Sequence, residues 1–278
     1  MSGRRSEPGD GTRELTPAVV LRTRSLREAD LVVILLTPGN GKLDCIARGA
    51  RRSRRRFPGG LPVGARGEAA LGRGRGSLVP LEHFAAGFDH SGLGRDLEGF
   101  AYVNYLCELT DRLVEGSGAD PASFALLCEA IETVISGGAC EGGGSTRPAI
   151  LRRFELGLLE GLGLLPALDR CGVCGSPVLA SIGVDGRGVP FSVSRGGALC
   201  LAHSRAAGGI PAPVLALARV LLHEDEDGRR AAYEAASAQT RRGLRDLCRE
   251  LIAPHLRAPL RSLAFFTQLP RSGIPSGS

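Results

Sequence analysis

The sequence is poor in aromatic residues, and its N-terminal part is the poorest. Aromatic residues make up 4% of the 278 residues, tryptophan is absent, and Phe57 is the only aromatic residue among residues 1–80. Proteins that bind single strands of nucleic acid without sequence preference usually stack the bases on aromatic side chains. Residues 1–80 lack the means to do so, and any nucleic acid bound there must be held through its phosphate backbone.

Motifs of common enzyme classes are absent as well. The sequence contains no GxxxxGK[ST] phosphate loop, no HExxH and no GxSxG, and the stretch GRGRGS at 72–77 is not followed by a helical pattern. The acidic run EDED at 224–227 is typical of a solvated helix terminus. Four histidines have no partnered setting and are expected in surface or packing positions, namely His83, His90, His223 and His255. We therefore expect a protein that is not an enzyme.

Long apolar runs are missing too. The run LVVILL at 31–36 is too short to span a bilayer, and the first 17 residues lack the apolar core of a secretory signal. We therefore expect a cytoplasmic protein with no membrane contact. Disulfides are rare in that compartment, so the cysteines need another explanation. Four lie in apolar patterns and are expected to be buried small hydrophobic residues, namely Cys45, Cys107, Cys128 and Cys248, while Cys140 receives no assignment.

Acidic residues are scarce where basic ones gather. Residues 1–80 carry 16 Lys and Arg against 7 Asp and Glu, whereas residues 81–278 are slightly acidic. Six arginines lie within nine positions that contain no acidic residue: Arg48, Arg51, Arg52, Arg54, Arg55 and Arg56. Lys42 is the only lysine, so the preference for arginine over lysine reflects composition, but the clustering still carries information. Like charges this close repel each other, which leaves two interpretations, a solvated loop or a surface for a polyanion.

The N-terminal region has the pattern of a small β-barrel. Residues 1–14 are polar and are expected to be disordered. Short β-rich runs broken by turns fill residues 15–82, and TPGNGK at 37–42 has the composition of a hairpin turn. Four or five strands in so short a region favour a closed five-stranded OB-fold, with the arginine run in a loop that follows a strand.

Helical periodicity replaces this pattern at about residue 94. One apolar stripe comprises Leu97, Phe100, Tyr102, Val103, Leu106, Leu109 and Leu113. Further helices are predicted from Pro121 to Ser136, over 147–166, over 211–224 and as one helix over 231–256. We thus expect a multi-domain α+β protein: an OB-fold over 15–82, a helical domain over 83–270 and a flexible tail over 271–278.

A cysteine-rich segment interrupts the helical domain at 171–203. Cys171 and Cys174 form a CxxC pair, and Cys200 and His203 form a CxxH pair 25 residues further on. Two such pairs describe a tetrahedral zinc site in a zinc-ribbon-like segment, with all four positions filled by protein, so that one Zn²⁺ per chain would be structural. A redox CxxC, a disulfide or four unrelated residues are the alternatives, although no βαβ pattern accompanies the CxxC.

Taken together, these patterns resemble those of the bacterial RecO family of recombination mediators. The resembling stretches are AVVLRTRSLREADLVVILLTPGNGKLDCIARGARRSRRRF at 18–57, YVNYLCELTDRLVEGSGADPASFALL at 102–127 and LRRFELGLLEGLGLLPALDRCGVCG at 151–175. The resemblance extends over nearly the whole of the chain expected to be ordered, in the family's order. One departure is His203, which stands where many relatives have cysteine and preserves zinc chemistry. Some relatives have lost the site, so the argument for zinc depends on the residues themselves.

The resemblance implies a function in DNA repair and homologous recombination. It implies binding of single- and double-stranded DNA, annealing of complementary strands, partnership with RecR, contact with single-strand binding protein, and help in loading RecA at the nucleoid. The DNA-contacting residues are then expected to be Lys42 and the six arginines at 48–56. The C-terminal tail of single-strand binding protein is acidic with an apolar end, so Arg152 and Arg153 on the 147–166 helix are candidates to receive it.

Two other functions are compatible with these patterns. One is a zinc-dependent nucleic-acid enzyme, a nuclease or a deaminase, although the HxE of the deaminases is missing ahead of the cysteines. The other is an OB-fold factor that binds RNA.

Overall fold

The computed structural model describes residues 15–73, 77–87, 96–116, 118–136, 146–178, 188–205 and 208–266. The tails expected at 1–14 and 271–278 lie outside these residues, as do His90 and Cys140. The chain divides into two compact units, one of residues 1–89 and 116–121 and one of residues 90–115 and 122–278. Among the described residues, no helix is both long and apolar enough to cross a membrane.

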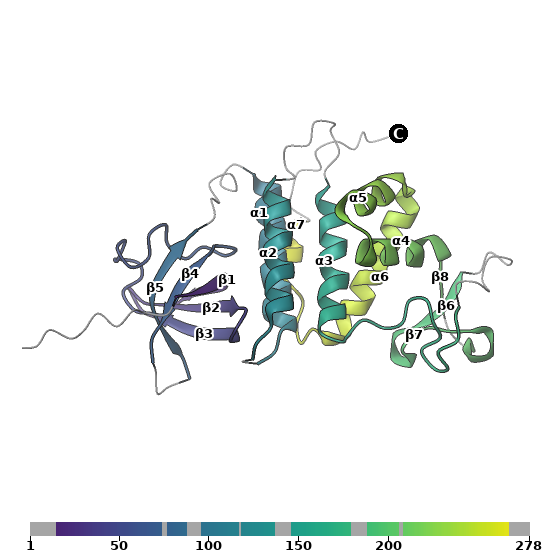
Figure 1. The fold of residues 1–278 in the computed structure, drawn as a ribbon, viewed down its shortest axis with the longest axis horizontal. Helices are drawn as coiled ribbons and strands as arrows, with labels where there is room; N and C mark the ends of the chain where they lie inside the picture. The colour runs from purple at the N-terminus through teal and green to yellow at the C-terminus, as the bar shows by residue number, and fades with distance from the viewer. Residues whose placement is uncertain are drawn as a thin grey trace, which may run out of the picture. The chain divides into compact units, whose positions relative to one another are not determined.

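The first unit is a closed five-stranded barrel, as the sequence predicts (Figure 1). Its strands are β1 (Leu15–Ser25), β2 (Leu31–Thr37), β3 (Gly41–Ala47), β4 (Arg66–Leu71) and β5 (Val79–Ala86). Neighbouring strands are antiparallel except β3 and β5, which run parallel and complete the OB-like order β1-β2-β3-β5-β4. The predicted turn joins β2 to β3, where Thr37 faces Gly41 and the Asn40 N–H donates to Thr37 Oγ1 at 3.1 Å.

The barrel core is built from small and branched residues around two phenylalanines. Phe57 and Phe84 are both buried, and Phe57 comes from the loop between β3 and β4 rather than from a strand. Leu61 and Ala65 of the same loop also belong to this core. The loop is therefore fixed to the barrel at several points along its length, immediately after the arginine run.

The second unit contains the helices α1 (Leu97–Leu113), α2 (Pro121–Ser136), α3 (Arg147–Gly161), α4 (Ala212–His223), α5 (Glu226–Ala235), α6 (Ala238–Ile252) and α7 (Arg261–Phe266). In the middle lies α3, which packs against α1, α4, α5 and α6 (Figure 1). Between α3 and α4 the chain forms a small sheet of β6 (Val189–Ser192), β7 (Gly197–Ala198) and β8 (Gly208–Ile210) in the order β7-β6-β8. The helical domain with an inserted β segment is thus confirmed.

Several details differ from the sequence predictions, and one is that the helix expected over 147–166 ends at Gly161. The single helix expected over 231–256 is two helices, because Ser237 caps α6 by accepting from the Thr240 N–H at 3.0 Å. The EDED run is the start of α5, where Asp225 accepts from the Gly228 N–H, so it begins a helix instead of only ending one. The stripe on α1 is buried only from Tyr102 onward, since Leu97 and Phe100 are exposed.

The four cysteines predicted to be small hydrophobic residues are all buried, namely Cys45, Cys107, Cys128 and Cys248. Burial raises the pKa of Cys45 to about 12, with a smaller contribution from the neighbouring charge of Asp44. A thiol held protonated in this way is a poor nucleophile.

A buried polar cluster joins α1, α3 and α6. Arg152 lies 2.9 Å from the Glu155 carboxylate, and Tyr105 donates to the same carboxylate at 2.5 Å. Arg152 also donates to the Arg245 carbonyl at 3.5 Å. Burial, together with the charge of Glu155, raises the pKa of Tyr105 well above its usual value, so this phenol remains a donor. Arg152 is therefore part of the helical core, not of a surface that a partner can reach.

Breaking this pair should be costly. We expect Arg152→Ala to lower the free energy of unfolding of the helical unit by about 3–5 kcal/mol, because it leaves the Glu155 charge buried without its partner. Urea denaturation followed by far-UV circular dichroism measures this loss. The double variant Arg152→Leu, Glu155→Leu is the control, since it removes both charges and should be much less destabilised. Equal losses in the two variants would contradict the prediction.

Candidate metal centre and nucleic-acid interface

Two tight turns, the knuckles, bring the four predicted ligands together. The first knuckle is Cys171–Cys174, closed by the Gly175 N–H donating to the Cys171 carbonyl at 2.8 Å. The second is Cys200–His203, closed by the His203 N–H donating to the Cys200 carbonyl at 2.9 Å. All four ligand atoms lie within 4.8 Å of one another. Two pairs of residues that are separated in the sequence by at least 26 positions thus form one cluster.

The distances fit a tetrahedral metal ion. Bond lengths of zinc to sulfur and nitrogen imply edges of about 3.8 Å between two sulfurs and about 3.5 Å between sulfur and nitrogen. Cys174 Sγ and Cys200 Sγ are 3.8 Å apart, and Cys171 Sγ is 3.6 Å from His203 Nδ1. Cys200 Sγ is somewhat closer to the same nitrogen, at 3.2 Å. The group can therefore hold a metal ion, and no ligand position is left for water.

Hydrogen bonds lower the pKa of two of the four ligands, Cys171 and Cys174. Hydrogen bonds from backbone N–H groups, foremost that of Cys200, lower the pKa of Cys171 to about 5. The side chain and N–H of Ser176 lower the pKa of Cys174. Metal ligands of this type must be thiolates, so both shifts favour binding. Only Cys171 is buried among the four.

Glycine allows the two knuckles to meet. A Cβ at Gly172 would lie 2.5 Å from the Gly196 carbonyl oxygen, and one at Gly197, where φ is +111°, would lie 2.3 Å from the Ala167 carbonyl oxygen. The Gly172 N–H donates to the Ala198 carbonyl at 2.8 Å. Glycine at these positions therefore permits the close backbone contact between the two knuckles.

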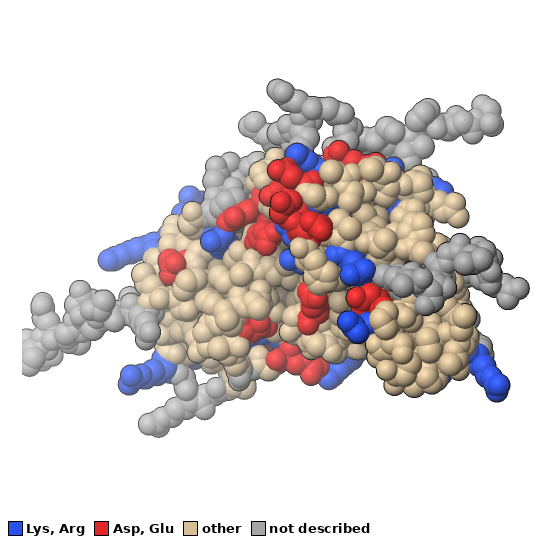
Figure 2. All heavy atoms as spheres, turned by 45° about the vertical axis from the view of Figure 1, so that its right-hand side comes forward, with Lys and Arg blue, Asp and Glu red and all other residues tan. Residues whose placement is uncertain are grey.

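The six arginines of the run lie on the loop between β3 and β4. All are exposed except Arg56, which is half-buried. Arg56 hydrogen-bonds the Arg48 carbonyl, and its guanidinium lies 5.3 Å from the centre of the Phe57 ring, so it holds the loop in place. Within the described part of the chain, Arg54 and Arg55 have no recorded hydrogen bond or ion pair, and their charge faces solvent. On the face drawn in Figure 2, basic side chains likewise extend outward from the surface.

The turn between β1 and β2 lies against this loop. The Gly49 N–H donates to Asp30 at 2.8 Å, the Arg51 side chain donates to Ser25, and Arg52 forms an ion pair with Glu28. Both members of that ion pair are largely exposed, so its contribution to stability is small and its partner is easily exchanged. This proximity also brings Arg24 and Arg27, both exposed, toward the run.

Sequence reasoning missed these two arginines because they are separated from the run by more than 20 positions. The signal that would have found them is the pairing of a β1–β2 hairpin, which places its turn beside the end of β3. Lys42, in contrast, was predicted together with the run but lies apart from it. It stands at the start of β3, half-buried, while Arg48 follows the end of that strand, so β3 separates the two by about 20 Å at 3.3 Å per residue.

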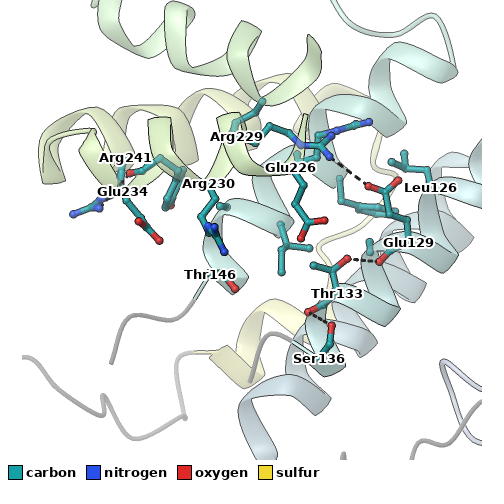
Figure 3. A pocket seen from close by; sticks show the side chains of 17 residues that line it. Leu126, Glu129, Thr133, Ser136, Thr146, Glu226, Arg229, Arg230, Glu234 and Arg241 are labelled. Carbon is teal, nitrogen blue, oxygen red and sulfur yellow. Dashed lines mark hydrogen bonds and ion pairs between the residues drawn. The ribbon is translucent and has the colours of Figure 1, made fainter. Parts of the chain in front are cut away.

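A cavity of about 300 Å³ lies between α2, α3, α4, α5 and α6. Its apolar lining includes Leu126, Ala130, Ile150, Phe154 and Leu221, and its polar lining includes Arg153, Arg229, Arg230 and Arg241 together with Glu129, Glu226 and Glu234. Figure 3 shows Arg229 reaching toward Glu129, 3.6 Å away. Arg153 has a buried Nε with no hydrogen-bond partner among the described residues, and burial, followed by the charge of Arg229, lowers its pKa. Of the two arginines proposed on α3, Arg153 is therefore the one at a cavity.

These features define a class of protein. It has an OB-like barrel with a basic loop, followed by a helical domain in which three cysteines and one histidine are placed so that they could hold a metal ion.

Comparison with known proteins agrees with this class. The model described as "Recombination protein O N terminal" matches residues 13–85, and the model described as "Recombination protein O C terminal" matches residues 94–264. The chain is 35% identical over 257 residues to the DNA repair protein RecO of Anaeromyxobacter sp. (strain K), which covers 90% of this chain and 94% of that protein. It is 34% identical over 257 residues to the RecO of Myxococcus xanthus (strain DK1622), with coverages of 91% and 96%. The chain belongs to the RecO family.

The geometry of the knuckles predicts one bound metal ion per chain. Protein prepared without chelator should contain it, and Cys171→Ser should lose it and become less stable, because a site of this type contributes to folding. Elemental analysis and thermal denaturation measure the two effects. Cys128→Ser is the matched control, since that buried cysteine lies outside the cluster and its loss should not change the metal content. Full metal content in Cys171→Ser would contradict the prediction.

Proposed function

We propose that this protein is a DNA repair and recombination mediator that binds single- and double-stranded DNA through its barrel. In this proposal it anneals complementary strands and helps to load RecA onto DNA coated with single-strand binding protein, in the cytoplasm at the nucleoid and without catalysis. The observation that carries the proposal is the exposed, structurally fixed arginine loop of the OB-like barrel. Membership of the RecO family supports the wider role.

The composition of the surface supports binding through phosphates. Phe57 is buried in the barrel core, so it is not available to stack a base. Arg51, Arg52, Arg54 and Arg55 are exposed on the same loop and can each neutralise a phosphate. Contacts to phosphates carry no direct sequence information, so binding should depend on salt and little on sequence.

We further propose that the knuckles hold Zn²⁺. Three sulfurs and one imidazole nitrogen in tetrahedral spacing are the ligands this ion prefers in structural sites. With all four positions taken by protein, the ion would stabilise the fold and would not activate water. This supports a structural ion over the alternative of a zinc-dependent nuclease or deaminase.

Partnership with RecR and with single-strand binding protein is part of the same proposal. An acidic tail with an apolar end matches the cavity between α2 and α6, where apolar side chains are flanked by arginines. Among the residues that the structure describes, the buried Nε of Arg153 has no hydrogen-bond partner, and an acidic ligand would satisfy this donor.

The function as a whole is tested by annealing. Complementary oligonucleotides coated with single-strand binding protein should anneal faster with the protein than without it, in the absence of ATP. Competition between RNA and single-stranded DNA of equal length separates this proposal from that of an RNA-binding factor.

Removing the arginine charge should weaken DNA binding at every sequence. For Arg51, Arg52, Arg54 and Arg55 changed together to alanine, we expect the slope of log K against log salt to become shallower by about 2–3 on single strands, at about 0.7 per phosphate contact. Annealing should slow as well, since close approach of two strands needs their charge screened. Titration of a labelled dT oligomer at several salt concentrations measures the slope.

The control is a variant with the same change of charge in the helical unit, with Arg242, Arg245, Arg249 and Arg257 changed to alanine, all exposed. Its salt slope should stay near that of the parent. If the loop is only solvated, the first variant will bind as tightly as the parent across the titration, and the proposed DNA surface is wrong. Neither variant should be strongly destabilised, because exposed arginines contribute little to stability.

Peptide binding tests the cavity. We expect Arg153→Glu to weaken binding of a peptide that copies the acidic tail of single-strand binding protein by at least tenfold, because the new charge repels the peptide inside a partly desolvated site. Fluorescence anisotropy of the labelled peptide measures the affinity. Arg249→Glu on the exposed face of α6 makes the same charge change outside the cavity and should bind normally. Unchanged binding in a folded Arg153→Glu protein would exclude this cavity as the receiving site.

A further inference from the structure

The two knuckles present apolar side chains to solvent. Val173, inside the first knuckle, is 52% exposed, and Leu201, inside the second, is 73% exposed. Among the large hydrophobic residues of the described chain, Leu201 is the most exposed. Folding usually buries such side chains, and an exposed pair is a mark of an interaction site when the two lie together.

Val173 and Leu201 stand on adjoining knuckles. Val173 is next to the ligand Cys174, and Leu201 is next to the ligand Cys200. The sulfurs of these two cysteines are 3.8 Å apart. The knuckles are also joined by the hydrogen bond from the Gly172 N–H to the Ala198 carbonyl, so both exposed residues belong to one small structural unit.

Three exposed arginines flank this surface. Arg170 precedes the first knuckle and donates to the Gly175 carbonyl at 3.5 Å. Arg195 donates to the Arg205 carbonyl at 3.4 Å, and Arg205 follows the second knuckle. The backbone of Arg195 also meets the first knuckle, since a Cβ on Gly172 would lie 2.6 Å from its carbonyl oxygen.

Acidic residues do not offset these arginines at the knuckles. In the described residues 166–178 and 188–205 the only carboxylate is Asp169, and it lies 3.6 Å from Arg219 of α4. A zinc ion with three thiolates would carry a net charge of about −1, which is less than the charge of the three guanidinium groups. The surface around Val173 and Leu201 therefore favours an anion.

The anionic partner could be a protein or a nucleic acid, and the size of the surface distinguishes between the two. A stable protein interface buries about 800 Å² on each side and is centred on large apolar or aromatic side chains. Two aliphatic side chains on turns are too few for that. A nucleic acid needs less, because a few phosphate contacts add to the affinity of a site that already binds elsewhere on the same strand.

We propose that the two knuckles form a second DNA-contacting surface, in which Arg195 and Arg205, with Arg170, hold phosphates while Val173 and Leu201 pack on sugars or base edges. This inference rests on the proposed DNA binding of the protein and adds a contact in the helical unit to the one in the barrel. Apolar side chains take such positions against exposed sugar and base surfaces in other nucleic-acid binders.

The test compares two double variants of the full chain on one labelled dT oligomer and one duplex. With Arg195→Ala, Arg205→Ala, we expect the salt slope on the oligomer to become shallower by about 1.4, at 0.7 per contact, and the affinity at 0.15 M salt to fall on the order of tenfold. The control, Arg242→Ala, Arg249→Ala, removes the same charge from the exposed face of α6 and should change neither quantity. Metal content should be equal in both variants, which shows that the knuckles are intact.

A second measurement uses the unaltered protein. Phenylglyoxal modifies accessible arginines, and mass spectrometry should show Arg195 and Arg205 protected when the dT oligomer is bound, with Arg242 and Arg249 unprotected. If the parent binds DNA while Arg195→Ala, Arg205→Ala matches it in slope and affinity, the second surface is wrong. The same conclusion follows if the two arginines stay accessible in the complex. If the parent itself does not bind DNA, the proposed function has failed, and this outcome is distinct from the others.

Discussion

Burial of Phe57 determines where the arginine run can lie. Its ring fills the barrel core with Phe84, and the Phe84 N–H donates to the Arg56 carbonyl at 3.0 Å, so the end of the run is bonded to β5. The arginines that precede Phe57 must then emerge at the surface of the barrel, because the core has no space or partner for them. Repulsion among these charges is borne by a loop that the core holds in one conformation. A loose loop would relieve the repulsion by spreading, and its charge would be diluted.

The same logic applies to the helical unit, with different chemistry. The described residues 166–178 and 188–205 bury only a few hydrophobic side chains, the largest being Phe191, and the two knuckles are joined by backbone hydrogen bonds and close contacts at glycines. A metal ion would replace the hydrophobic core that a segment of this length cannot build. In the barrel a few buried groups, and in the helical unit the joined knuckles, hold exposed arginines near one another.

The sequence predicted those parts of the fold that depend on local patterns. The Pro38–Gly41 turn, the start of α2 at Pro121 and the ligand spacing at 171–203 are all short-range signals, and the structure has them. The break before Ser237 was missed because apolar periodicity continues across it, and only the serine cap identifies the new helix. The exposure of Leu97 and Phe100 was missed because periodicity does not tell how far a stripe is covered.

Arg152 was assigned to a surface because its partner Glu155 becomes significant only once α3 is known to be enclosed by other helices. The approach of Arg24 and Arg27 to the run depends on strand pairing, which a local pattern does not specify.

The choice of side chains makes the two basic surfaces sensitive to different conditions. Guanidinium groups stay charged at every pH a cell experiences, so the barrel loop responds to ionic strength and hardly at all to acidity. A metal ion in the knuckles would need thiolates and a neutral imidazole as ligands, so its binding would weaken in acid. On the proposals made for Zn²⁺ and for DNA, acid or metal depletion would loosen the phosphate contacts of Arg195 and Arg205 and leave the barrel loop unchanged. On the same proposals, ionic strength would act on DNA binding through the barrel, and metal supply would act on it through the helical unit.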